Sequence, residues 1–377
     1  MNLIGVKPKK IIFFPDTLYE IRYTGEIWGK YFEKSKVFNI FSNEKSDLYS
    51  TISLGVIFSQ KPDIIPTDRL TGWWEEDSLQ FRFEGEEYTY QNYNLVQNIF
   101  SRNTGILETG VLQNKCAFVL GCGSVGSLVA LELARAGIGR FVLVDNDILE
   151  YHNLCRHQCG IEEVGEYKVY SLRRRILEIN PSAEIEAIVS TVEMLDKPIF
   201  DNFCKKDQTV MIGCADNRSA DVYANSVSVM YGIPFLSIGF WERAFAGEIF
   251  YYLPNKGMPC YKCALGEGNS MSQRTSTNRR LYTNEADLSK VNFEPGISVD
   301  INFVTTVGIK LLLDIFNLDN EGYTPRLLPT LTQYTLVCNT NNPKIGGEMA
   351  EIFSYPLQVT TSLQVGHGSN CPPCEFE

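Results

Sequence analysis

The sequence predicts an α/β protein: a Rossmann-like domain with a mostly parallel sheet, preceded by a small α+β module. From Lys115 onward, short apolar runs alternate with helical patterns, as they do in repeated βαβ units. A glycine-rich loop, Gly121 to Gly126, follows the first of these apolar runs and opens a helical pattern. Residues 1–95 are instead dense in aromatic and β-branched residues, which favour strands.

Residues 1–95 form the expected front module, which we predict to be winged-helix-like. Within it, Leu79 to Phe83 alternates apolar and polar residues with a period of two, as a half-buried strand does. The stretch 46–58 is compatible with a short helix. No residue pattern in this module points to a particular chemistry.

Residues 96–377 form the expected second domain. The helix over 127–137 ends at a glycine suited to a C-terminal cap, and the helix over 165–180 is stopped by Pro181. The polar stretch 266–296 carries few apolar anchors and predicts a long crossover loop or lid. The expected strands are Cys116–Leu120, 141–144, 183–189, Thr209–Gly213 and 234–240, and the other expected helices are 220–231 and 299–316.

Composition limits the classes of partner and the compartment. The net charge of −11 argues against binding nucleic acid or an anionic membrane through bulk attraction. No apolar run approaches the roughly 18 residues that a membrane span requires, and the first residues lack a cleavable signal pattern. The 11 cysteines are an odd number in a large acidic chain, which argues against a disulfide framework. We therefore expect a cytoplasmic protein.

The glycine loop and Asp145 indicate a nucleotide site. Gly121, Gly123 and Gly126 allow a tight turn and the close approach of a phosphate or ribose. Asp145 ends the next predicted strand, where a carboxylate can bind ribose hydroxyls. The alternative is a structural glycine turn, and this pattern alone does not distinguish NAD from ATP.

The stretch VDNDILEYHNLCRHQ, which follows that strand, favours ATP. It supplies Asp147, Asn153 and Arg156, and Lys168 comes soon afterwards. Arg156 and Lys168 are suited to neutralising a triphosphate and its transition state, while Asp216, after a later strand, is suited to Mg²⁺. Each residue alone has a structural alternative: a surface ion pair for Arg156, a solvated helix position for Lys168 and a helix cap at Asp216. An NAD-dependent oxidoreductase would leave Arg156 and Asp216 without a role.

The combined motifs resemble the E1-like adenylating family of the ThiF/MoeB type, which includes activators of sulfur-carrier proteins. The glycine loop stands here as GCGSVG, followed by DNDILEYHNLCRH, GEYK and ADN, within residues 101–374. His157 occupies a position where the family usually has glutamine. The resemblance implies adenylation with ATP and Mg²⁺. The upstream element Ser101-Arg102-Asn103 resembles one whose arginine reaches the ATP of a partner subunit, which implies a homodimer.

Two C-x-x-C pairs, Cys260 with Cys263 and Cys371 with Cys374, predict a tetrahedral zinc site. Four thiolates leave no open coordination position, so the metal would be structural. A redox-active pair is the alternative. The resemblance agrees with structural zinc, because the same pairs clamp the domain in that family.

The substrate is the least determined part of the prediction. No cysteine lies between Cys263 and Cys338, which argues against a thioester relay. Either the acyl-adenylate is the working intermediate, or the cysteine comes from another protein. The front module is similar in length to that of adenylating enzymes that modify ribosomally made peptides, such as the microcin C7 and pantocin A enzymes. That likeness implies a precursor peptide whose leader adds a strand to the module. It also implies adenylation of a carboxyl or an amide group of that peptide, which leads to cyclisation or dehydration in antibiotic biosynthesis. The alternatives are a packing or dimerisation role for the module, a Gly-Gly-tailed ubiquitin-like or sulfur-carrier substrate, and a non-catalytic protein that only presents a leader.

Overall fold

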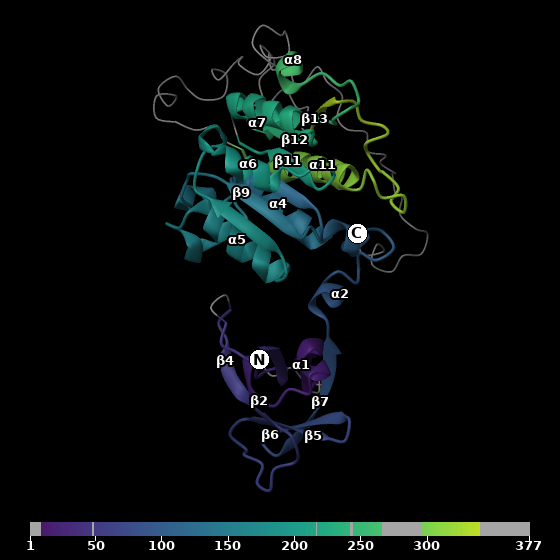
Figure 1. The fold of residues 1–377 in the computed structure, drawn as a ribbon. Coiled ribbons are helices and arrows are strands. Elements are labelled where there is room, and N and C mark those ends of the chain that lie inside the picture. Colours follow the sequence, from purple (N-terminus) through teal and green to yellow (C-terminus); the bar gives the residue numbers. More distant parts are fainter. Residues whose placement is uncertain (1–8, 47–48, 216, 242–243, 266–295, 340–377) are drawn as a thin grey trace, which may run out of the picture. The chain divides into compact units, whose positions relative to one another are not determined.

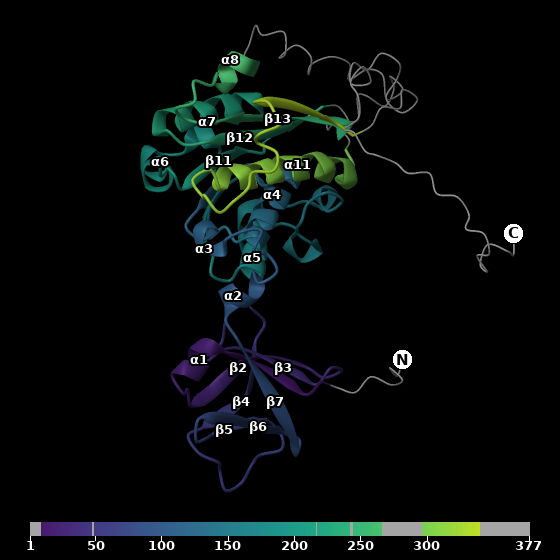
Figure 2. The same cartoon turned by 90° about the vertical axis from the view of Figure 1, so that its right-hand side faces the viewer.

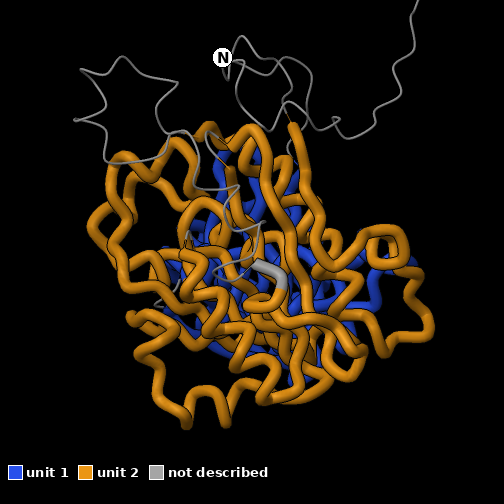
Figure 3. Tube along the Cα trace, turned by 90° about the horizontal axis from the view of Figure 1, so that it is seen from above, with its two compact units in different colours: residues 1–110, 134–139, 174–183 blue, residues 111–133, 140–173, 184–377 orange. Residues whose placement is uncertain are grey.

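The computed structural model describes residues 9–46, 49–215, 217–241, 244–265 and 296–339. The chain divides into two compact units, coloured separately in Figure 3. The first contains residues 1–110 together with 134–139 and 174–183, and the second contains 111–133, 140–173 and 184–377. No helix among the described residues is long and apolar enough to cross a membrane.

Seven strands of the first unit close into a barrel, in the order β1-β3-β2-β4-β5-β6-β7 (Figure 1). Closure depends on β1, which pairs in parallel with β3 on one side and with β7 on the other. The strands are β1 (Ile11–Pro15), β2 (Gly25–Phe32), β3 (Val37–Ser42), β4 (Ile52–Phe58), β5 (Leu70–Glu75), β6 (Ser78–Phe83) and β7 (Glu86–Tyr93). The short helices α1 (Asp16–Glu20) and α2 (Leu95–Ile99) also belong to this unit, and α3 (Thr109–Leu112) crosses its boundary with the second unit.

An aromatic core fills the barrel. Phe14, Phe38 and Phe81 are among its fully buried side chains, and the Phe14 and Phe81 rings lie 5.8 Å apart. The module is thus richer in strands than the winged-helix-like form that we expected. The stretch 46–58 is not a helix, because its second half is strand β4. Its β-branched and aromatic residues pair on both sides, with β2 and β5.

The second unit is built on a seven-stranded sheet in the order β10-β9-β8-β11-β12-β13-β14. The first five strands in this order pair in parallel, and β13 and β14 pair antiparallel. The sheet consists of β8 (Cys116–Leu120), β9 (Arg140–Val144), β10 (Glu184–Ile188), β11 (Thr209–Gly213), β12 (Phe235–Phe240), β13 (Ala246–Tyr252) and β14 (Tyr334–Cys338). The mostly parallel sheet confirms the predicted α/β fold class.

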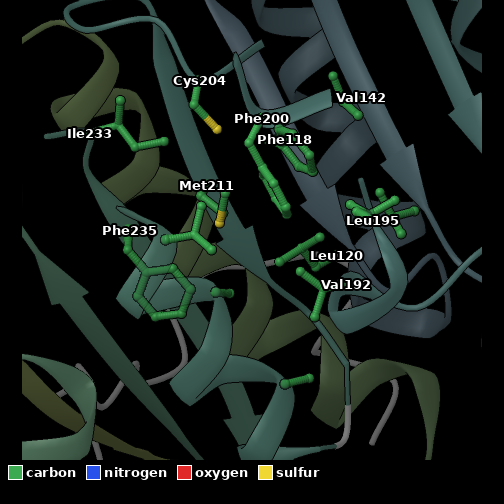
Figure 4. Close-up of a cluster of buried hydrophobic side chains, with 14 of the residues drawn as sticks. Phe118, Leu120, Val142, Val192, Leu195, Phe200, Cys204, Met211, Ile233 and Phe235 are labelled. Atoms are coloured by element: carbon green, nitrogen blue, oxygen red, sulfur yellow. The ribbon is translucent and has the colours of Figure 1, made fainter. Parts of the chain in front are cut away.

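Helices cover both faces of this sheet (Figures 1 and 2). On one face, Phe200 of α6 (Lys197–Phe203) stacks against Phe118 of β8 with ring centroids 6.1 Å apart (Figure 4). Ala224 of α7 (Arg218–Tyr231) belongs to the same buried cluster. On the other face, α11 packs against β12 and β13, with Gly308 directly against Ile238. The helices are α4 (Ser124–Ala136), α5 (Lys168–Ile179), α6 (Lys197–Phe203), α7 (Arg218–Tyr231), α8 (Tyr261–Leu265) and α11 (Ser298–Phe316), with single turns η1 (Tyr151–Asn153), η2 (Ile161–Glu163) and η3 (Val192–Met194).

The direction of chain progression reverses between β8 and β11. From β8 the chain moves outward through β9 to β10, and it then returns to β11 and continues to β12 on the opposite side. The helices that follow β8 and β11 therefore leave on opposite faces of the sheet. Such a switch point leaves a crevice outside the carboxyl ends of the strands, which is where open α/β sheets bind ligands.

Candidate functional site

A cavity of about 430 Å³ lies at this switch point, entirely within the second unit. Its walls come from segments that follow five neighbouring strands of the sheet. They include Gly121 after β8, Asp145 after β9, Thr191 after β10, Ala215 after β11 and Phe240 at the end of β12. Residues that the sequence places far apart thus meet at one edge, as the rule for parallel strands requires.

The glycine loop between β8 and α4 passes close to neighbouring backbone. Gly121 has a φ of +88°, and a Cβ atom there would lie 2.8 Å from the backbone nitrogen of Ala215. A Cβ atom on Gly126 would overlap the carbonyl oxygen of Gly121, so glycine is required for α4 to begin against the loop. Gly123 lines the cavity and faces open space, as does Ser124 at the first turn of α4. The first N–H groups of a helix have no partner within that helix, so this turn is suited to binding an anion.

Two carboxylates stand at the end of β9. Asp145 accepts hydrogen bonds from the backbone N–H of Cys122, at 2.7 Å, and of Asp147, at 2.8 Å. These bonds fix the Asp145 side chain between the glycine loop and its own loop. A carboxylate still has acceptor positions left after two such bonds, so it can also receive ribose hydroxyls.

Lys168 supplies a buried cation to the cavity wall. Its side chain is only 10% exposed, and its Nζ donates to Oδ2 of Asp147 at 2.8 Å. The backbone N–H of Lys168 also donates to the carbonyl oxygen of Asp147, at 3.0 Å, which fixes the start of α5 beside the loop. The Asp147 side chain is 66% exposed, so the ion pair joins a buried cation to a solvent-exposed carboxylate. An incoming anion can therefore compete for the Lys168 ammonium group.

The connection between β9 and α5 brings Asn153 and Arg156 to the same cavity. Oδ1 of Asn153 accepts the backbone N–H of Glu150, at 2.9 Å, and so holds the turn η1 closed. Arg156 follows this turn, with its backbone N–H donating to the carbonyl oxygen of Asn153 at 3.0 Å. The geometry gives Asn153 a loop-shaping role besides any contact with a ligand.

His157 anchors this connection to the glycine loop. Its Nδ1 accepts the backbone N–H of Cys159 at 3.0 Å, so the ring proton is on Nε2 and donates to the carbonyl oxygen of Cys122 at 2.8 Å. Burial lowers the pKa of His157, so the ring is neutral near pH 7. The imidazole therefore bridges the two loops that carry Arg156 and Gly121.

The opposite end of the cavity is apolar. Phe240 and Trp241 line it from the end of β12, and Ile301 lines it from the first turn of α11. Behind them, Glu248 of β13 is 6% exposed and pairs with Arg218 at 2.7 Å. The cavity thus combines a charged end near β9 with an apolar end near β12.

A family model for the ThiF family matches residues 97–346. The chain belongs to the ThiF family. The family region contains the whole of the cavity wall described above, from Leu120 to Ile301.

Curated relatives of this ThiF-family chain cover part of it. Ubiquitin-like modifier-activating enzyme 5 of Dictyostelium discoideum is 25% identical over 182 residues, which are 44% of this chain and 47% of that protein. Adenylyltransferase and sulfurtransferase MOCS3 of Sus scrofa is 31% identical over 170 residues, or 44% of this chain and 36% of that protein. The chain spans less than half the length of these relatives.

Two solved structures also match part of this chain at low sequence identity. The crystal structure of E. coli MccB with MccA-N7isoASN is 21% identical, with a TM-score of 0.48, and the match covers 64% of this chain and 69% of that one. The crystal structure of PaaA is 15% identical, with a TM-score of 0.45, covering 61% and 62%.

Some predicted site residues are not among those that line the cavity. Arg102 is exposed in a turn after α2 and belongs to the first unit. Its neighbour Asn103 donates from Nδ2 to the carbonyl oxygen of Arg135, at 2.9 Å, and so caps the end of α4. Gly126 packs against the backbone of Gly121 and does not line the cavity. Asp216, proposed for Mg²⁺, lies outside the described residues.

The first C-x-x-C pair is described, and the second is not. Sγ of Cys260 lies 3.5 Å from Sγ of Cys263, close to the roughly 3.8 Å between two thiolates on one tetrahedral zinc. Buried Tyr261 fixes the pair, because its backbone N–H donates to Oδ1 of Asn225 at 2.7 Å. Cys371 and Cys374 lie outside the described residues, as does the predicted loop up to residue 295. Within the part that is described, no three His, Cys, Asp or Glu side chains gather to hold a metal ion.

The residues after β10 and at the end of β12 that line the cavity belong to no recognisable sequence motif. Thr191 and Glu193 follow β10, and Phe240 and Trp241 end β12. Only their position directly after predicted parallel strands indicates that they lie at the crevice where such sheets bind ligands. The anchoring role of His157 had no signal beyond its departure from the usual family residue.

Proposed function

We propose that this protein is an ATP-dependent adenylating enzyme that converts a carboxylate into an acyl-adenylate. The observation that supports this most is the meeting of Asp145, Arg156 and Lys168 with the glycine loop in one cavity at the switch point. Two cations opposite a ribose-binding carboxylate suit a nucleoside triphosphate better than NAD. Membership of the ThiF family supports the same activity.

In this proposal, ATP lies along the carboxyl edge of the sheet. Asp145 binds the ribose hydroxyls, and the base lies toward Thr191 beyond β9. The substrate carboxylate oxygen attacks the α-phosphorus, a new acyl–oxygen–phosphorus bond forms, and the bond to the β-phosphate breaks. Arg156 and Lys168 stabilise the charge on the leaving pyrophosphate. Asp216 would hold Mg²⁺, which would supply further positive charge to the phosphates.

Positioning and electrostatics would account for catalysis, because no side chain needs to form a covalent bond. Asn153 shapes the loop that presents Arg156, and Asp147 orients Lys168. The proposal includes Arg102 as a residue that reaches the ATP of a second subunit, so the working form would be a homodimer.

The proposed substrate is a ribosomally made precursor peptide whose leader binds the front module, with cyclisation or dehydration as the outcome. Barrel closure restricts where such a leader could add as a strand. β3 pairs with β1 only through Val37–Asn39, and β4 pairs with β5 only from Gly55. Among the described residues, 40–42 and 52–54 therefore each have one side free of strand pairing. The carbonyl oxygen of Ile40 already accepts the Tyr93 hydroxyl at 2.6 Å, so 52–54 is the proposed docking edge. A Gly-Gly-tailed carrier protein is the second candidate substrate, favoured by the curated relatives.

ATP–pyrophosphate exchange tests this function. Purified protein is incubated with labelled pyrophosphate, ATP and either a precursor peptide encoded beside its gene or a Gly-Gly-tailed carrier protein. We expect exchange with the peptide and its loss when the leader is removed. Exchange only with the carrier would transfer the substrate assignment to the second candidate, and no exchange with either would contradict adenylation.

We also propose a structural zinc ion held by Cys260, Cys263, Cys371 and Cys374. The expected content is about one zinc per chain, measured by mass spectrometry of the metals in protein purified without chelator. Cys371→Ser is expected to lower this content together with the thermal stability of the second unit. A well-folded wild-type protein free of zinc would contradict the proposal.

A further inference from the structure

The two ends of the cavity differ in chemistry. The end near β9 holds Asp145, Arg156 and Lys168, whereas none of the described lining residues at the β12 end carries a charge. That end is formed by Phe240 and Trp241, together with Ile238, Gly239, Ala244, Gly296 and Ile301. A ligand that fills the whole cavity must therefore present one strongly polar and one apolar part.

Trp241 is held in place by a polar network around the buried carboxylate of Glu248. Its indole N–H donates to Oε2 of Glu248 at 3.2 Å, and the Tyr334 hydroxyl donates to the same oxygen at 2.8 Å. The other carboxylate oxygen, Oε1, accepts from Nη2 of Arg218 at 2.7 Å. Burial, and secondly the Glu248 carboxylate, raise the pKa of Tyr334 above its ordinary value, so the hydroxyl remains a donor. The network satisfies the charge of Glu248 and leaves Trp241 as a rigid wall.

A glycine in β12 leaves space for the Glu248 side chain of this network. Gly239 pairs with Glu248 across β12 and β13, and a Cβ atom on Gly239 would lie 3.2 Å from Cγ of Glu248. The glycine lets the Glu248 side chain lie across the strand toward the indole. At the other side of the apolar end, Ala244 and Ile301 are each 4% exposed and both lie near Gly296. A small and a branched side chain therefore line the same end of the cavity as Trp241.

We propose that the β12 end binds the side chain of the residue whose carboxyl group is activated, and that this side chain is apolar. This inference rests on the proposed adenylation, which puts the α-phosphate between the two ends of the cavity. An aromatic or branched side chain would lie against Trp241 and Ile301. A Gly-Gly tail would leave this end empty, and an acidic side chain would lose its hydration there without a cationic partner among the described lining residues.

Non-reactive analogues of the acyl-adenylate test the inference directly. N-acetylated glycyl, phenylalanyl and aspartyl sulfamates of adenosine differ only in the acyl side chain, and their affinities are measured by calorimetry beside that of ATP. We expect the phenylalanyl analogue to bind at least about tenfold more tightly than the glycyl analogue, and the aspartyl analogue to bind more weakly than both. Trp241→Ala and, independently, Ile301→Ala are expected to reduce the phenylalanyl-to-glycyl ratio.

Phe303→Ala is the matched control, because Phe303 lies on the same helix as Ile301 but is 47% exposed and is not among the lining residues. It is expected to keep the wild-type ratio. Equal binding of the glycyl and phenylalanyl analogues by protein that binds ATP would overturn the inference and leave adenylation intact. Failure to bind either ATP or any analogue would overturn both. A ratio unchanged in both Trp241→Ala and Ile301→Ala would also overturn the inference.

Discussion

Replacing Lys168 with methionine is expected to slow ATP–pyrophosphate exchange by about 100- to 1,000-fold. The Lys168 side chain is 10% exposed in the cavity wall, where water screens its charge little, so that charge acts strongly on a phosphate. Methionine keeps most of the side-chain volume and removes the charge. The measurement is the rate at saturating ATP, together with the affinity for ATP, because a group that stabilises the leaving pyrophosphate should lower the rate more than the affinity.

Two further variants separate catalysis from structure. Lys197→Met removes a lysine of the same unit that pairs with Asp201 at 2.7 Å on the surface, 78% exposed, and is expected to leave the rate unchanged. Asp147→Asn breaks the pair with Lys168 but leaves the ammonium group in place, so the loss of rate should be much smaller than in Lys168→Met. Equal losses in Asp147→Asn and Lys168→Met would mean that the ion pair matters only for structure.

The parallel sheet was predictable because its signal is local. Each βαβ unit repeats a short apolar run, a turn and an amphipathic helix, so the order of elements indicates the class of sheet. The barrel was not predictable in the same way. Its closure depends on the pairing of β1 with both β3 and β7. The two partners of Ile11, which are Val37 and Thr89, lie far from it in the sequence. Residue patterns indicate strands but not which distant strand each one pairs with.

The charged end of the site was predictable for a related reason. Asp145 and Arg156 follow one strand directly, and the crevice rule places strand ends together once the sheet is known to be parallel. Trp241 was missed because its neighbours in the sequence look like an ordinary buried strand. Its role depends on Glu248, Arg218 and Tyr334, which come from three other elements. Networks of that kind carry no local sequence signal.

A buried carboxylate on α11 supports the helix that contributes Ile301 to the site. Asp314 is fully buried and accepts five hydrogen bonds: from the hydroxyl of Tyr323 at 2.7 Å, and from the backbone N–H groups of Arg326 (3.0 and 2.9 Å), Leu327 (2.6 Å) and Leu328 (2.9 Å). Burial, and secondly the hydrogen bond to Asp314, raise the pKa of Tyr323 above its ordinary value. One side chain therefore binds a whole loop to the helix end.

Asp314→Ala is expected to destabilise the second unit by about 3 kcal/mol, since each buried donor left unpaired costs about 1–3 kcal/mol and water will reach some of them. The measurement is the urea midpoint together with hydrogen exchange of the amides at Arg326, Leu327 and Leu328, because two units need not unfold as one. Exposed Asp319, a few residues further on, supplies the control Asp319→Ala, expected within about 0.5 kcal/mol of wild type.

Asp314→Asn distinguishes hydrogen bonding from mere filling of space. It keeps the volume and one acceptor oxygen, but its amide nitrogen would face donors that need an acceptor, so the loss of stability should approach that of alanine. If asparagine restored most of the stability, packing rather than the carboxylate would hold the loop. If instead both variants lost protection at the three amides while the rest of the unit kept it, the carboxylate would be a local clamp. We expect instead that the second unit as a whole loses stability, because the loop bound by Asp314 leads directly into β14. This strand completes the sheet beside Glu248.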